Sequence, residues 1–116
     1  MKIDSILDLF NLGSLEKAVF QVCFESGMVG ATTLARKTGV SRTSIYDVLT
    51  KLIKAGLIVE SQKGGVKVFA TSKPETMELL IGEKQKEVLA AQTALETFKS
   101  DYYAGGKPFR PRLQVF

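Results

Sequence analysis

The stretch GVSRTSIYDVLTKLIKAG, residues 39–56, predicts an amphipathic helix. Ser41 is suited to cap its N-terminus, and Gly56 is suited to end it. The apolar residues recur at helical spacing along one face: Ile45, Val48, Leu49 and Leu52. The opposite face carries hydroxyl groups, cations, a tyrosine and one acid, Asp47. This polar face is either an ordinary solvated surface or a surface that binds a partner.

The segments on either side of this helix complete a supersecondary pattern. The preceding segment predicts a short helix over residues 32–37 that ends at Gly39, and two helices joined by a tight turn form a helix-turn-helix. The following segment, LIVESQKGGVKVFA, predicts a β-hairpin because Gly64 and Gly65 tolerate the positive φ of a tight turn. The pattern leaves open whether Val68 or Phe69 faces inward. A helix-turn-helix followed by a hairpin predicts a winged helix.

Further helices are predicted at both ends of this unit. A short helix is expected over residues 3–10 and a second over residues 15–26, with Ser14 as its cap. The sequence SKPE, residues 72–75, has capping-box spacing and should begin a last, long helix. The predicted fold is mainly α with a small β-hairpin wing. Its parts are a winged helix-turn-helix domain over residues 1–72, a long helix over 73–103 and a linker or tail over 104–116.

The long helix contains a heptad seam that predicts a homodimer through a coiled coil. Residues at alternating spacings of four and three form this seam: Met77, Ile81, Val88, Ala91, Leu95, Phe98 and Tyr102. Lys84 interrupts it. β-Branched residues at Ile81 and Val88 favour two parallel strands, although antiparallel packing, or packing on the first helix of the same chain, fits the same seam.

Charge and composition exclude several classes of function. The net charge of the chain is +4, but residues 31–73 alone carry eight cations against two acids, a net +6, which suits a polyanionic partner. The chain has no histidine, a single cysteine, Cys23, and no glycine-rich nucleotide-binding motif, so no enzyme, metal site or cofactor is predicted. No apolar run is long enough to span a membrane, and Asp4 and Asp8 interrupt any signal sequence, so a cytoplasmic location is expected.

The second helix of a helix-turn-helix enters the DNA major groove by its N-terminal end, which assigns roles to the polar residues. We expect base contacts first and phosphate contacts at the edges of the surface. The predicted major-groove residues are Ser41, Arg42, Thr43 and Ser44, with Tyr46, Lys51 and Lys54 at the edge. Thr32 and Thr33, at the start of the preceding helix, can hold a phosphate, and Lys63 and Lys67 on the wing suit the minor groove or its phosphates. Phosphates would repel Asp47, so it either reaches a base or braces a neighbour, and bracing of Arg42, Lys51 or Tyr46 is the expectation.

Three alternatives to DNA binding fit the same residues. The polar face could be solvated, with Asp47 and Lys51 forming only an i, i+4 ion pair. The winged helix could be a protein-interaction module that contacts no nucleic acid. It could also bind RNA.

The order of these elements resembles a known family. ESGMVGATTLARKTGVSRTSIYDVLTKLIKAGLI, residues 25–58, followed by a glycine wing, VFATSKPE and a long charged helix, resembles the N-terminal region of TrmB-type transcriptional regulators. The most specific part is SIYDVLTKL, residues 44–52, which is close to the family pattern I-Y-x-V-L-x-x-L.

The resemblance covers roughly residues 6–103 and implies a function. It places the DNA-reading helix at residues 41–56, the wing at 60–70 and the dimerisation helix at 74–102. Members of this family also carry a sugar-binding domain. GGKPFRPRLQVF, residues 105–116, resembles the linker and first strand of that domain, so the chain is expected to be a truncated form or a short member, and no effector site is assigned.

Overall fold

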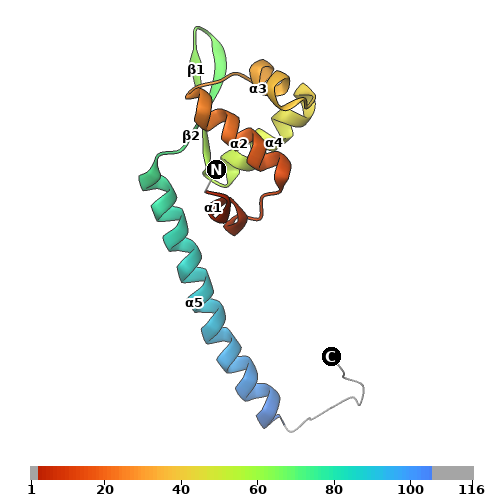
Figure 1. The fold of residues 1–116 in the computed structure, drawn as a ribbon. Coiled ribbons are helices and arrows are strands. Elements are labelled where there is room, and N and C mark those ends of the chain that lie inside the picture. The colour runs from red at the N-terminus through yellow and green to blue at the C-terminus, as the bar shows by residue number, and fades with distance from the viewer. Residues whose placement is uncertain (1–2, 106–116) are drawn as a thin grey trace. The chain divides into compact units, whose positions relative to one another are not determined.

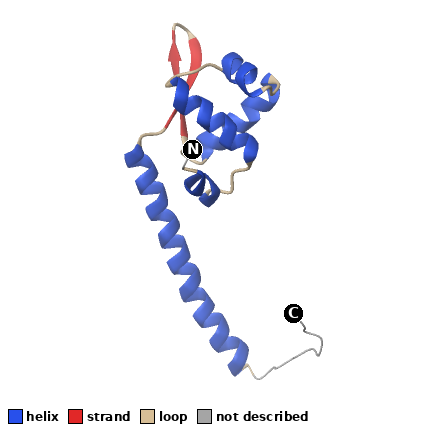
Figure 2. Ribbon diagram, viewed as in Figure 1, coloured by secondary structure: helices blue, strands red, loops and turns tan. Residues whose placement is uncertain are grey.

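The computed structural model describes residues 3–105, which form five helices and one hairpin (Figures 1 and 2). The elements, in chain order, are α1 (Asp4–Leu9), α2 (Ser14–Ser26), α3 (Ala31–Thr38), α4 (Arg42–Lys54), β1 (Ile58–Lys63), β2 (Val66–Thr71) and α5 (Pro74–Ala104). The tail assigned from the sequence as the start of an effector domain lies, from residue 106 onward, outside the described residues.

Helices α3 and α4 are joined by the tight turn that the sequence predicts. Gly39 follows α3 in the left-handed region, with φ 75°, and its N–H donates to the Ala35 carbonyl. Ser41 caps α4, because its side-chain oxygen accepts the Ser44 N–H at 3.2 Å. Only glycine adopts such a left-handed conformation without strain, so the local residues fix this turn.

The wing is an antiparallel hairpin in which Ile58 faces Thr71 and Lys63 faces Val66. Its turn is Gly64-Gly65, and both glycines have positive φ, as predicted. Phe69 is the inward residue, since it is only 2% exposed, and its N–H and carbonyl bond with the backbone of Val29 at 2.8 and 3.0 Å. This isolated antiparallel bridge ties β2 of the two-stranded sheet to the segment before α3.

One hydrophobic core lies beneath these elements. The apolar face predicted for α4 is buried as expected, and it packs with Phe20 of α2, Leu34 of α3 and Phe69 of β2. Burial of side chains of this size is the main stabilising contribution to a small domain. The helix-turn-helix and its hairpin thus form a winged helix, which confirms the predicted fold class.

The chain divides into two compact units, residues 1–81 and 82–116. The first unit extends past residue 72, where the sequence predicted the domain to end, and includes the first turns of α5, whose Met77 and Leu80 pack against its core. The prediction that Ser72 begins a capping box is wrong. The helix starts at Pro74, and the buried Ser72 hydroxyl instead donates to the Gly56 carbonyl at 2.6 Å. Similarly Gly13, not Ser14, caps α2.

Two properties of residues 3–105 bear on the class of protein. No helix there is sufficiently long and apolar to cross a membrane. Within the same residues, histidine, cysteine and acidic side chains nowhere gather in a group of three that could hold a metal ion.

Candidate nucleic-acid interface

The outer face of α4 is the centre of the candidate surface. Arg42, Thr43 and Lys54 are exposed, and Tyr46 is partly exposed at 39%. These side chains are held outward because the opposite face of α4 is buried in the core. The predicted amphipathic arrangement of this helix is therefore confirmed, while its contact with DNA stays a prediction.

Two polar residues at the start of α4, Ser41 and Ser44, form hydrogen bonds with each other. The Ser41 hydroxyl donates to the Ser44 hydroxyl at 3.1 Å while also accepting the Ser44 N–H. Ser44 is half-buried. These two serines therefore shape the helix N-terminus, and Thr43 is the member of this predicted group that has no side-chain hydrogen bond within residues 3–105.

Arg42 bridges two helices and contacts an aromatic ring. Its Nη1 donates to Thr32 Oγ1 of α3 at 3.0 Å, and its Nη2 donates to the Tyr46 hydroxyl at 2.9 Å. The guanidinium carbon also lies 5.6 Å from the centre of the Tyr46 ring, within the range of a cation–π contact. The predicted groove residue thus has a defined orientation in the structure.

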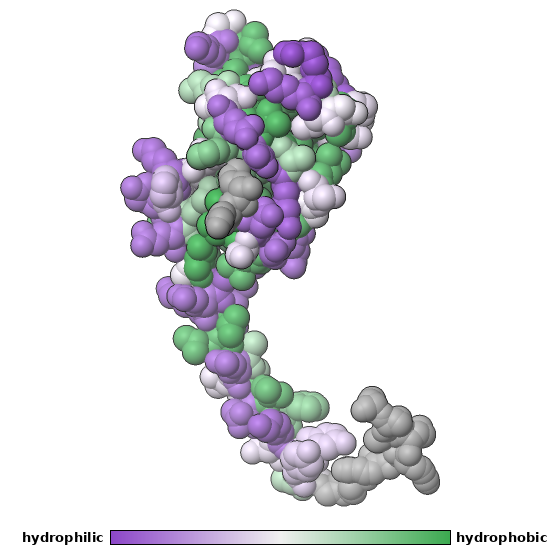
Figure 3. Space-filling model, viewed as in Figure 1, coloured by the Kyte–Doolittle hydropathy of each residue, from purple (hydrophilic) through white to green (hydrophobic). Residues whose placement is uncertain are grey.

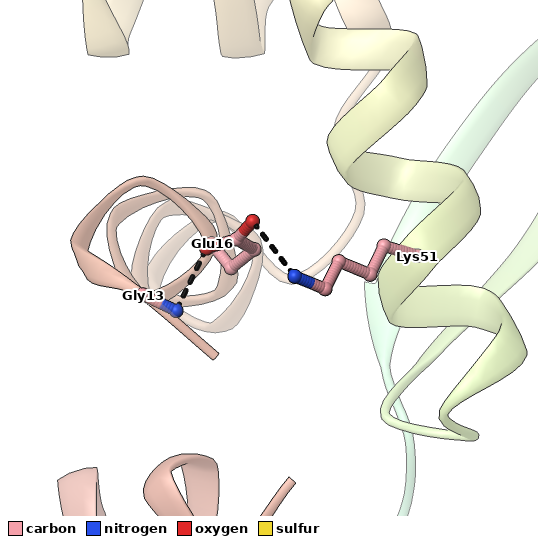
Figure 4. Close-up of polar contacts among 3 residues, drawn as sticks. All are labelled: Gly13, Glu16 and Lys51. Carbon is pink, nitrogen blue, oxygen red and sulfur yellow. Dashed lines mark hydrogen bonds and ion pairs between the residues drawn. The ribbon is translucent and has the colours of Figure 1, made fainter. Parts of the chain in front are cut away.

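Lys51 reaches away from the first turn of α4 toward α2 (Figure 4). Its ammonium lies 3.4 Å from the Glu16 carboxylate, which also accepts the Gly13 N–H at 2.8 Å. Partial burial acts to raise the pKa of Glu16, but the backbone N–H groups of Glu16 and Gly13 and the Lys51 charge outweigh it and hold this pKa below its ordinary value. Lys51 therefore links α4 to α2, which no local sequence pattern indicated.

Asp47 does not have the bracing role expected for it. Arg42 bonds to Thr32 and Tyr46, and Lys51 pairs with Glu16. Within the part of the chain that the structure describes, Asp47 forms no hydrogen bond or ion pair, and it is exposed on α4. The bracing hypothesis is wrong, and the i, i+4 pair with Lys51 is not formed either.

The wing presents two of the predicted lysines. Lys67 lies 3.7 Å from Glu60 on the neighbouring strand, so part of its charge is balanced within the hairpin. Lys63 is exposed and adjoins the glycine turn. Val66, which the sequence analysis missed as a surface residue, is 60% exposed beside them.

Residues from α3, α4 and the wing meet at one recess of about 390 Å³. It is lined by Gly30, Ala31, Thr32, Thr33, Arg42, Tyr46, Val66, Lys67 and Val68. The structure therefore brings together five of the predicted binding residues from three separate elements. The sequence did not identify Val66 and Val68, although their alternation with Phe69 could have placed them on the outer face of β2.

The predicted dimer seam falls into two parts. Met77 and Ile81 are partly buried and, together with Phe20 and Phe24 of α2, line an apolar groove of about 420 Å³ in the first unit. The later members are exposed side chains of α5: Val88, Ala91, Leu95, Phe98 and Tyr102. Hydrophobic and hydrophilic side chains are both visible along this helix (Figure 3). Phe98 and Tyr102 stack with their ring centres 5.8 Å apart.

Cys23 does not contribute to the candidate surface. It is fully buried in the core, and burial raises the pKa of its thiol to about 12. A thiol in this state is a structural residue and not a nucleophile.

A helix-turn-helix with a hairpin wing, whose outer face is rich in cations and hydroxyl groups, defines the winged-helix class of transcription regulators. Residues 7–75 match the family model for the sugar-specific transcriptional regulator TrmB. The match spans more than half of the chain, and the protein belongs to this family. No curated protein sequence matches the chain significantly.

Solved structures with the same fold support the architecture. The ST1889 protein from the thermoacidophilic archaeon Sulfolobus tokodaii is 23% identical with a TM-score of 0.64, covering 79% of this chain and 99% of that one. A possible transcriptional regulator from Methanosarcina mazei Go1 is 14% identical with a TM-score of 0.65, covering 85% and 88%. A MarR family protein from Bacillus stearothermophilus is 14% identical with a TM-score of 0.54, covering 84% and 80%. At these sequence identities, the structural similarity is evidence for the fold alone.

Proposed function

We propose that the protein binds double-stranded DNA sequence-specifically as a homodimer and so regulates transcription. The observation that carries the proposal is the recess at which α3, α4 and the wing present hydroxyl, arginine and lysine groups together. A solvated surface has no need to gather such groups from three elements. Family membership supports the same function.

The side chains divide between base and phosphate contacts. Arg42 and Thr43, at the N-terminal end of α4, are placed for base edges in the major groove. Lys54 and Lys63 are exposed and have no ion pair among the described residues, so they suit phosphates. Lys51 shares its charge with Glu16 and contributes less.

Exposed apolar residues on α5 support the homodimer. Val88 is 55% exposed, Leu95 51% and Phe98 60%, and these side chains lie on one heptad seam. A contiguous apolar stripe of this kind on a single chain indicates a protein interface. Two copies related by two-fold symmetry would bind two related half-sites.

A salt titration of duplex DNA binding tests the DNA contact. Selection from a random duplex library first supplies the specific sequence, and fluorescence anisotropy then gives the affinity at several salt concentrations. If the dimer neutralises at least about four phosphates, the log–log slope should be about −3.6 or steeper. If no duplex is selected, or if the slope on duplex DNA is flat, the protein-interaction module is left as the function. Preference for single-stranded RNA over duplex DNA would make it an RNA-binding protein.

Sedimentation of a variant tests the homodimer. Leu95→Lys places a charge in the middle of the seam and should yield monomers. If this variant sediments as the parent dimer does, the seam assignment is wrong. A Tyr102→Cys variant should form a disulfide between copies in a parallel dimer and none in an antiparallel one, since only the parallel arrangement brings the two cysteines together.

A further inference from the structure

We propose that Tyr46 and Thr32 are positioning residues that hold the Arg42 guanidinium in the orientation in which it reads a base pair. The inference rests on the proposed DNA binding and deepens it. It assigns to Tyr46 an effect on sequence specificity that passes through Arg42, in place of the direct DNA contact predicted from the sequence.

The hydrogen bonds of Arg42 fix both ends of its planar group. Nη1 is bonded to Thr32 Oγ1 at 3.0 Å and Nη2 to the Tyr46 hydroxyl at 2.9 Å. The two acceptors belong to different helices, α3 and α4, so the guanidinium bridges the two helices of the helix-turn-helix. A planar group held at both terminal nitrogens cannot rotate without breaking one of these bonds.

The Tyr46 ring adds a second constraint. The guanidinium carbon lies 5.6 Å from the ring centre, so the ring restricts the arginine side chain as its hydroxyl accepts the hydrogen bond. Arg42 and Tyr46 both line the recess, which is also lined by residues at the start of α3 and on the wing. Arg42 is exposed there, so DNA can reach it.

The bonds leave enough donors for recognition. A guanidinium has five N–H groups, of which the two contacts use two, and the remaining three point at no other acceptor within residues 3–105. A guanine edge needs two donors, to O6 and N7. The two hydrogen bonds to Thr32 and Tyr46, here called the clamp, therefore leave enough N–H groups in number to read a base. The clamp removes rotamer freedom that an unclamped arginine would lose only on binding.

The hydroxyl and the ring of Tyr46 contact Arg42 in different ways, so they can be tested separately. Its hydroxyl accepts from Arg42, and its ring is partly exposed at 39%. Removal of the hydroxyl alone, in Tyr46→Phe, keeps the ring and frees one end of the guanidinium. This variant therefore separates positioning from packing.

A double-mutant cycle on the full chain tests the proposal, with Arg42→Ala, Tyr46→Phe and the double variant. The assay is anisotropy on the selected duplex and on a random duplex. Tyr46→Phe should lower affinity for the selected duplex about three- to tenfold, the size of the net contribution of one typical hydrogen bond, and change random-duplex affinity less than about twofold. In the Arg42→Ala background, Tyr46→Phe should not change the affinity, because the guanidinium that Tyr46 positions is absent.

Three results would overturn the proposal. Additive losses in the double variant would mean that Tyr46 contacts DNA itself. Tighter binding by Tyr46→Phe would mean that the clamp withholds Arg42 from DNA. If the variants lose affinity equally for the selected and the random duplex, Arg42 contacts a phosphate and does not read a base. Tyr103→Phe, which removes an exposed hydroxyl from α5 outside the seam, is the matched control for loss of a tyrosine hydroxyl.

A measurement without DNA separates this proposal from the proposed function. Relaxation of the Arg42 Nε–H by nitrogen-15 NMR should show a restricted side chain in the parent and a mobile one in Tyr46→Phe. If no duplex is bound, the proposed function fails whatever the clamp does. If the Nε–H is already mobile in the parent, the clamp itself is refuted.

Discussion

Replacing Glu16 by glutamine should lower stability at neutral pH and leave it almost unchanged in acid. Glu16 lies in the first turn of α2, accepts the Gly13 N–H at 2.8 Å and lies 3.4 Å from Lys51. Glutamine is nearly isosteric and retains an oxygen for the Gly13 N–H. The variant therefore removes the charge and its ion pair while the cap stays in place.

The magnitude follows from the two interactions that depend on this charge. A carboxylate near a helix N-terminus contributes about 0.3–1 kcal/mol. The ion pair contributes at the low end of about 0.2–1 kcal/mol, because the Lys51 side chain is 52% exposed and solvent screens it. We expect Glu16→Gln to reduce the free energy of unfolding by roughly 1 kcal/mol.

The pH dependence identifies the charge as the cause. The pKa of Glu16 in the folded chain lies below its ordinary value of 4.5, so its stabilising effect is complete above that pH and is lost as the pH falls through the folded-state pKa. Urea unfolding of the parent and the variant should therefore differ near neutral pH and converge as the pH falls through the folded-state pKa of Glu16.

The control lies on the same helix. Among the described residues, Glu25 accepts a side-chain hydrogen bond from Gln21, at 3.1 Å, and forms no ion pair, so Glu25→Gln should not reproduce the loss of stability expected for Glu16→Gln. If the difference in unfolding free energy between the parent and Glu16→Gln stays constant from acid to neutral pH, the reasoning is refuted. The loss would then come from an interaction that does not depend on the charge of Glu16.

The remaining predictions concern the contacts that close the domain. Ser72→Ala leaves the Gly56 carbonyl without the hydroxyl that now bonds to it at 2.6 Å, and urea unfolding should show a loss of about 1–3 kcal/mol. Gly56→Ala must adopt φ 84° with its Cβ 3.2 Å from Leu80, which should cost about 1–2 kcal/mol at unchanged m-value. The Cys23 thiol, with its pKa raised to about 12 by burial, should react with an alkylating agent at mildly alkaline pH only after denaturant is added, and rapid labelling of the folded chain would contradict the buried position.

Local patterns were sufficient to predict the architecture. The buried face of α4, the left-handed Gly39 and the glycine turn of the wing each depend on residues a few positions apart, and each was predicted. Hydrophobic periodicity and the conformational needs of tight turns determine such features, so they are visible without coordinates.

The contacts that give the surface its detail depend on residues far apart in the chain. Lys51 meets Glu16 across 35 positions, and the Ser72 hydroxyl meets Gly56 across 16. Spacing within one helix suggested different partners, such as Asp47 for Lys51. Because several acceptors compete for each lysine or hydroxyl, only the packing of helices against one another selects among them.

The bridge between Val29 and Phe69 has a practical consequence for engineering. It ties the base of the wing to the segment before α3, whereas a side chain added at Gly64 or Gly65 would meet nothing within 4 Å. The hairpin tip is therefore a permissive insertion site, although the base is not. Extending both strands there by matched pairs of residues preserves the alternation of faces and lengthens the wing without disturbing Phe69 in the core. Such chains would be a graded series in which the reach of the wing varies and the rest of the domain stays the same.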